Sequence, residues 1–137
     1  MNIDGSMFGS LDIAVSGLKA YGKQMAVISS NVANARTTDA GDGTPYRRLE
    51  AIFKSQGDGI SGVEIDDLFE DTSDFQKILA NPGDPRADDN GYISMPNVNM
   101  AVETASLMQA SRAYQANAAI LKRYQAMVKT SLELLQA

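Results

Sequence analysis

Two apolar stripes, one at each end of the chain, most constrain how this sequence can fold. In the N-terminal part, apolar or small residues alternate at spacings of three and four, which is the pattern of a heptad seam on a helix. The positions are Leu11, Ala14, Leu18, Tyr21, Met25, Ile28, Val32 and Ala35. The spacing predicts a helix of about 25 residues. Gly17 and Gly22 each weaken that helix by about 1 kcal/mol relative to alanine, so it depends on packing against a partner.

The C-terminal part repeats the alternation over a longer span. Its positions are Leu107, Ala110, Tyr114, Asn117, Leu121, Tyr124, Val128, Ser131 and Leu135. A second line flanks it, made of Ala113, Ile120, Met127 and Leu134. The combined apolar face is wider than a two-stranded seam, so more than one neighbour is needed to cover it.

End signals agree with this second helix. Asn97 or Asn99 supplies an N-cap, and Glu103 lies in the first turn, where the helix dipole favours an acid. Basic residues from position 122 onward lie late in the segment, where the dipole favours cations. We therefore expect a helix from about residue 98 to about residue 135.

The segment between the stripes, residues 36 to 96, has a different composition. It holds all four prolines, seven of the eleven glycines, and 13 acidic against 6 basic residues. Period-two stretches predict short strands at 46–54, 62–68, 75–79 and 91–95, separated by turn formers. The segment has too few large apolar residues for a substantial core, so we expect it to lean on the helices or on another molecule.

Composition removes most catalytic chemistry. The 137 residues include no cysteine and no histidine, which excludes disulfides, thiolate nucleophiles and every histidine-dependent triad or zinc site. A net charge of −5 argues against nucleic-acid binding, and no apolar run approaches the roughly 20 residues that span a bilayer. Residues 1–4 lack the basic start of a secretory signal. We expect no cofactor, no nucleic acid and no direct lipid insertion.

Four features of the middle segment remain as candidates for chemistry. An acidic run could bind a cation or a basic partner, although such runs are usually solvated; it comprises Asp66, Asp67, Glu70, Asp71 and Asp74. The segment ending at Gly91 fails the spacing of a calcium loop, because Arg86 falls at its first ligand position. Glycines around Asp42 could form an anion nest, but no strand, lysine and helix N-terminus follow in the order of a phosphate loop. Residues 46–48, YRR, form a basic and aromatic cluster that we interpret as exposed strand residues.

The sequence predicts a mainly α fold with a small β part: long N- and C-terminal helices packed as a coiled-coil-like pair, with a loop-rich β-hairpin segment between them. The apolar faces of these helices would need partners to cover them. A helical adaptor or export chaperone would also have paired amphipathic helices, but it should form a small discrete oligomer. An enzyme would have to use Asp66, Asp67 or Asp74 with a lysine or a metal.

Several motifs resemble those of the bacterial flagellar axial proteins. Residues 12–18, DIAVSGL, and 28–34, ISSNVAN, look like the N-terminal signature shared by rod, hook and hook-associated subunits. Further motifs narrow the resemblance to the proximal rod subunits; they are 43–48, GTPYRR; 81–83, NPG; 90–92, NGY; 96–99, PNVN; and 111–117, SRAYQAN. The stretch around Asp84 and Arg86 departs from the pattern, because a histidine and an acid are expected there.

The resemblance implies a non-enzymatic subunit of the flagellar basal-body rod, the hollow shaft that transmits motor torque and conducts exported subunits. Its partners would be neighbouring copies, other rod subunits, the basal-body base and the flagellar type III export apparatus, with export into the cell envelope and no cleaved signal peptide. Residues 1–35 and 98–137 would form an inner tube, and residues 36–97 would face outward. The expected assembly interface comprises Leu11, Leu18, Tyr21, Met25, Ile28, Asn31, Asn34, Leu107, Tyr114, Asn117, Leu121, Tyr124 and Val128.

Overall fold

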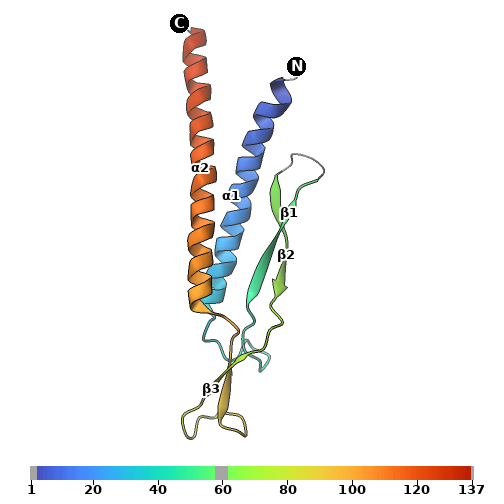
Figure 1. The fold of residues 1–137 in the computed structure, drawn as a ribbon, viewed down its shortest axis with the longest axis vertical. Coiled ribbons are helices and arrows are strands. Elements are labelled where there is room, and N and C mark those ends of the chain that lie inside the picture. Colours follow the sequence, from blue (N-terminus) through green and yellow to red (C-terminus); the bar gives the residue numbers. More distant parts are fainter. Residues whose placement is uncertain (1–2, 58–61, 137) are drawn as a thin grey trace.

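Two long antiparallel helices dominate the molecule (Figure 1). The computed structural model describes residues 3–57 and 62–136. Helix α1 spans Ile3–Ala33 and helix α2 spans Met100–Gln136. Both termini lie at the same end of the helix pair, and the two helices diverge toward that end (Figure 1). The prediction of a mainly helical chain with a small β part is confirmed.

The helix boundaries differ from the expected ones at the start of α1 and the end of α2, whereas the N-cap of α2 is one of the two predicted residues. Helix α1 has 31 residues and begins at Ile3, eight positions before the first residue of the predicted stripe. Asn99 is the N-cap of α2, since its Oδ1 accepts hydrogen bonds from the backbone nitrogens of Ala101 and Val102 at 3.0 and 3.3 Å. Because α2 continues to Gln136, its last turn contains no basic residue, so the late cations do not stand at the negative end of the helix dipole as predicted.

The middle segment forms two separate antiparallel hairpins, close to the four predicted strands. Strand β1, Leu49–Ser55, pairs with β2, Val63–Glu70, and the register shifts by a bulge between Ala51 and Phe53. Strand β3, Gln76–Leu79, pairs with β4, Tyr92–Met95. The loop between β3 and β4 turns on glycines with positive φ, 88° at Gly83 and 79° at Gly91, values that other residues rarely adopt.

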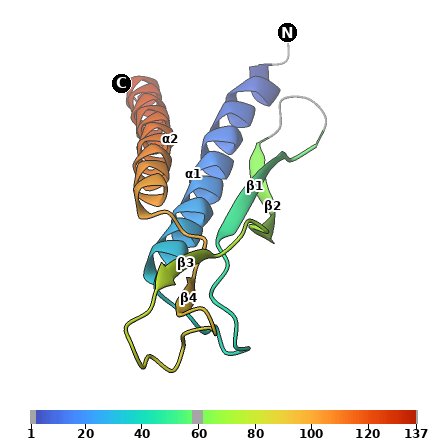
Figure 2. The ribbon, with the colours of Figure 1, turned by 60° about the horizontal axis from the view of Figure 1, so that its bottom comes forward.

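The β1–β2 hairpin packs on α1, on the side away from α2 (Figures 1 and 2). Ile65 is buried, and the rings of Phe53 and Tyr21 stack at a centroid distance of 5.2 Å. The β3–β4 hairpin lies beyond the end of the helix pair that is opposite the termini (Figure 2). The expectation that the middle segment leans on the helices is therefore confirmed for the first hairpin.

Small residues dominate the contact between the helices. Ala14 and Ala110 are buried, and an added Cβ at Gly17 would lie 2.8 Å from the Asn117 side-chain nitrogen. Such residues allow close backbone approach, which explains a glycine in the middle of α1 despite its cost to helix stability. Within the part of the chain that the structure describes, neither helix is apolar enough over a sufficient length to cross a membrane.

Candidate assembly surface

The expected interface residues fall into three classes of exposure. Ile28 and Asn31 are buried, and Tyr114 is exposed. The other ten are half-buried: Leu11, Leu18, Tyr21, Met25, Asn34, Leu107, Asn117, Leu121, Tyr124 and Val128. The set is therefore shared between contacts inside the chain, such as Asn117 against Gly17, and surface that remains open.

An apolar groove opens where the two helices diverge toward the termini. Leu11 of α1 faces Leu121, Tyr124, Val128 and Leu132 of α2 across a hollow of about 350 Å³. The apolar stripes of the two helices pack against each other near the hairpins. Toward the termini the helices separate, and the same stripes remain partly exposed. The groove is a surface that another helix could fill.

A second apolar surface follows α2 outside the groove. Ile120, Met127 and Leu134 recur every seven residues and keep 50%, 49% and 75% of their surface exposed. Residues seven apart lie on one helix face two turns apart. This is the flanking line noted in the sequence, and the chain itself leaves it uncovered.

A buried polar cluster joins α1, α2 and the start of β1. Glu103 of α2 is 0% exposed and Asn31 of α1 is 1% exposed. The Asn31 side-chain nitrogen donates to Glu103 Oε2 at 3.1 Å, and Arg48 Nε donates to Glu103 Oε1 at 2.7 Å. Asn31 also makes two hydrogen bonds with the backbone of Leu49: its Nδ2 donates to the Leu49 oxygen, and its Oδ1 accepts from the Leu49 nitrogen, at 2.9 Å each. The Tyr46 hydroxyl donates to the same Oδ1 at 3.0 Å.

Every polar atom buried in this cluster has a partner, so the charge of Glu103 is compensated. The hydrogen bond to Glu103 raises the pKa of Arg48 above its ordinary value, and the nearby carboxylates of Glu103, Glu50 and Asp71 act in the same direction. The cluster therefore holds the start of β1, at Arg48 and Leu49, against both helices.

The sequence pattern predicts Glu103 in the first turn of the second helix, where it lies, but it does not predict this cluster. Residues 46–48 are expected to be exposed, whereas Arg48 pairs with Glu103 and the Arg47 guanidinium lies 4.3 Å from the centre of the Phe75 ring. One signal could have found it, since Glu103 lies four residues before Leu107 and so extends the three-four stripe of α2. An acid at a seam position needs a buried partner.

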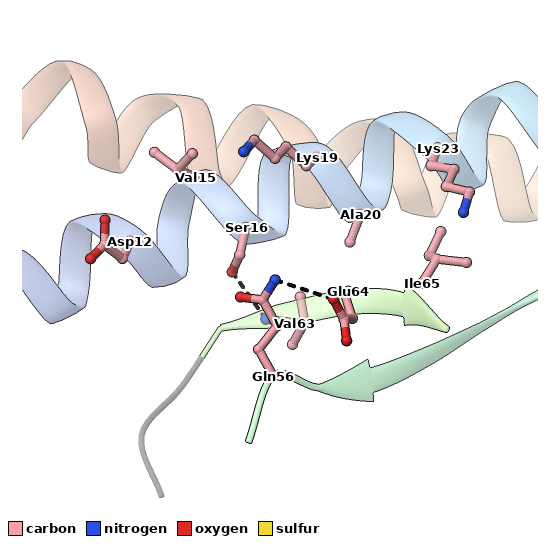
Figure 3. A pocket seen from close by; sticks show the side chains of 10 residues that line it. All are labelled: Asp12, Val15, Ser16, Lys19, Ala20, Lys23, Gln56, Val63, Glu64 and Ile65. Atoms are coloured by element: carbon pink, nitrogen blue, oxygen red, sulfur yellow. Dashed lines mark hydrogen bonds between the residues drawn. The ribbon is translucent and has the colours of Figure 1, made fainter. Parts of the chain in front are cut away.

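A polar hollow separates α1 from the first hairpin (Figure 3). It has a volume of about 540 Å³ and is lined by Lys19 and Lys23 of α1 and by Gln56 and Glu64 of the hairpin, among others. Ser16 Oγ accepts a hydrogen bond from the Val63 nitrogen at 3.0 Å (Figure 3). The same hydroxyl donates to the Ile13 oxygen at 2.8 Å. Ser16 thus holds the hairpin to the helix.

The acidic run does not gather into one site. Asp66 pairs with Lys54 at 3.3 Å and Asp71 lies 3.6 Å from Arg48, so its members serve different neighbours. A backbone hydrogen bond from Ser73 lowers the pKa of Asp71, with Arg48 and Arg47 contributing less. Over residues 3–57 and 62–136, no group of three or more acidic side chains is placed to hold a metal ion.

The loop glycines do not form an open anion nest. Asp39 Oδ1 accepts from the nitrogens of Gly41 and Gly43 at 2.8 and 3.0 Å, and Asp42 Oδ1 accepts from Thr44. The loop's own carboxylates therefore occupy the donors that an anion would need, which agrees with the missing phosphate-loop pattern in the sequence. The loop near position 84, where the sequence departs from the family pattern, also pairs its own charges, because Arg86 forms an ion pair with Asp84 at 2.8 Å.

Comparison with known proteins places both helices in flagellar families. The family described as "Flagella basal body rod protein" matches residues 11–40. The family described as "Flagellar basal body rod FlgEFG protein C-terminal" matches residues 89–134. The two matched regions contain most of α1 and α2, the elements that carry the uncovered apolar surface.

Whole-length relatives extend this likeness over the middle segment. The chain is 40% identical over 129 residues to the flagellar basal-body rod protein FlgC of Agrobacterium fabrum, with 91% of this chain and 92% of the relative covered. It is 37% identical to FlgC of Salmonella typhimurium, covering 94% and 98%, and 34% identical to FlgC of Bacillus subtilis, covering 93% and 97%. Likeness of this extent shows that the chain belongs to the family of flagellar basal-body rod proteins FlgC.

Proposed function

We propose that this chain is a structural subunit of the rod of the flagellar basal body and that it assembles through the uncovered faces of α1 and α2. One observation supports the proposal above all. The helix pair leaves an apolar groove and an apolar line open along α2, the surface a subunit needs when its folding is completed by neighbours. Assembly with other rod components follows from the family, and further copies of this chain are partners of the same kind.

We further propose the arrangement of the subunit in the rod. Residues 1–35 and 98–137 would form the inner tube around the export channel, and residues 36–97 would face outward toward neighbouring rod subunits. The β3–β4 hairpin suits an outward place because its loop is mostly exposed and carries three acidic residues against one basic residue, whereas the helices carry the open groove and the exposed line of α2. Delivery by the type III export apparatus, without a cleaved signal peptide, into the periplasmic part of the cell envelope is part of this proposal.

A non-enzymatic role agrees with the chemistry of the described residues. The acidic run is spread over several neighbours and does not converge on one site, and the hollow beside α1 is open. A binding or adaptor role as a small discrete complex would instead leave the chain outside isolated basal bodies.

The substitution Leu121→Asp tests the proposal at the groove. Burying a leucine is worth about 1.5 to 3 kcal/mol, and a carboxylate in its place adds a desolvation cost at every copy. We expect loss of motility and of this chain from isolated basal bodies, with unchanged synthesis. Gln115→Asp introduces the same charge at an exposed position of α2 and should leave both unchanged.

Circular dichroism of the purified Leu121→Asp chain separates lost assembly from lost folding, because the helix content should stay near that of the parent. Normal swimming by cells that carry Leu121→Asp would contradict the proposed interface.

A further inference from the structure

The outer face of the β1–β2 hairpin is acidic and partly apolar. Phe53 faces α1, so its neighbour Ile52 points to the opposite side, and Glu50 and Phe69 share that side as cross-strand partners. Ile52 and Phe69 are both exposed. The two strands carry five acidic residues and one lysine, and that lysine, Lys54, already pairs with Asp66.

The exposed line on α2 has the opposite charge. Arg123 lies three residues after Ile120 and four before Met127, so the three side chains share one helix face. Arg112, eleven residues before Arg123, stands on nearly the same side. Helix α2 carries four basic and two acidic residues, and one of those acids, Glu103, is buried.

These two faces cannot meet within one molecule. Helix α1 lies between α2 and the first hairpin in both views (Figures 1 and 2). Complementary faces on opposite sides of a subunit make a heterologous contact, which repeats from copy to copy and generates rings or helices rather than closed pairs. Charge pairs at the rim of an apolar contact set the register of such packing.

We propose that the α2 face around Arg123 packs against the outer face of the β1–β2 hairpin of a second copy of this chain. The inference rests on the proposed rod function and adds the surface through which copies meet. Ile120 and Met127 cover Ile52 and Phe69, and Arg123 lies against the acidic strand residues near Asp67, which with Asp66 occupies the stretch of β2 across from Ile52 at the bulge.

Disulfide trapping tests this contact cleanly because the chain has no cysteine. Two full-length chains, one with Ile52→Cys and the other with Met127→Cys, are produced together in flagellated cells without the parent chain, and their basal bodies are isolated and oxidised. We expect a dimer on a non-reducing gel that neither variant gives alone. Lys129→Cys is the control for Met127→Cys, since it is exposed and lies about 200° around the same helix.

Reversing the charges of Arg123 and Asp67 tests the same contact without relying on the placement of the cysteines. Arg123→Glu on the Met127→Cys chain should lower the dimer yield roughly tenfold, because it replaces an attraction with a repulsion. Asp67→Lys on the Ile52→Cys chain should restore it. Asp67 forms no ion pair with the described residues, and the hydrogen bond that its Oδ1 accepts from the Leu68 nitrogen is exposed, so its reversal should disturb the fold little.

The outcomes separate this inference from the proposed function. Absence of the chain from basal bodies in both the parent and the variants would refute the rod assignment. Chains present in basal bodies that give no Ile52→Cys to Met127→Cys dimer, or as much dimer with Lys129→Cys, would overturn the copy-to-copy contact alone.

Discussion

At the scale of single residues, the strongest constraint is the buried carboxylate of Glu103. Its two oxygens take hydrogen bonds from Asn31 and Arg48, which lie 72 and 55 positions away in the sequence. A buried charge is tolerated only with such partners, so three distant segments must meet at one point. The cluster is a specific contact in a chain whose helices otherwise approach each other at small residues, such as Gly17 against Asn117.

We expect Glu103→Gln to destabilise the fold by about 1 to 3 kcal/mol, because Arg48 loses its charged acceptor and one buried group is left poorly matched. Urea unfolding followed by circular dichroism measures the change. Glu133→Gln makes the same substitution in the same helix, where the exposed pair with Lys129 is 3.8 Å long, and should change stability by less than about 0.5 kcal/mol. Equal effects of the two variants would show that the buried cluster adds nothing.

Asp84 forms an ion pair with Arg86 in the loop between β3 and β4. Hydrogen bonds from the Arg86 side chain and backbone lower the pKa of Asp84 to about 2. A depressed carboxyl pKa stabilises the folded chain above the ordinary value near 3.8, and this contribution is lost as the pH falls from there to about 2. An NMR titration should find the low value in the parent and a higher one in Arg86→Ala. An unchanged pKa in that variant would show that the ion pair does not hold the loop.

At the scale of elements, the first hairpin is held to α1 by a very close approach at Gly62. A Cβ at this position would lie 2.6 Å from the Cβ of Ser16, whose hydroxyl accepts the backbone hydrogen bond from Val63. Only glycine leaves room for that bond. The hairpin has little core of its own, so its stability depends on this contact and on the packing of Ile65.

Gly62→Ala should push the hairpin away from α1 at a cost of about 1 to 3 kcal/mol. Amide hydrogen exchange at Val63 measures the loss of protection directly. Gly9→Ala serves as the control because nothing lies within 4 Å of its added Cβ, and a helical alanine there should stabilise by up to about 1 kcal/mol. Protection at Val63 that survived Gly62→Ala would contradict the close contact.

The helices and strands were predictable from the sequence, whereas the tertiary contacts between them were not. The three-four spacing from Leu11 to Ala35 and from Leu107 to Leu135 is a local property, so it identified both helices. The pairing of Arg48 with Glu103 depends on the path of the chain between the helices, which no local pattern specifies. The groove beside Leu121 depends on where the helices diverge, and that follows from packing over their whole length.

At the scale of the whole molecule, the packing of α2 differs between its two ends. Near the hairpins α2 is held by α1 and by the Glu103 cluster, but toward the termini it stands beside an open groove. Helix propensity alone is marginal in water, so a helix without a packed face is stable only with neighbours. A rod subunit with such a half-covered helix would couple the last part of its folding to assembly.

The isolated chain should therefore show graded protection along α2. We expect amides of residues 103–117 to exchange slowly and those of residues 120–134 to exchange at least about tenfold faster, since the second stretch carries the exposed Ile120, Met127 and Leu134. The same measurement on assembled basal bodies should slow exchange in residues 120–134 and change residues 103–117 little. Limited proteolysis gives an independent check, with cuts in α2 falling after Asn117. Uniform protection along α2 in the isolated chain would mean that the helix needs no neighbour, and the coupling of folding to assembly would have to be abandoned.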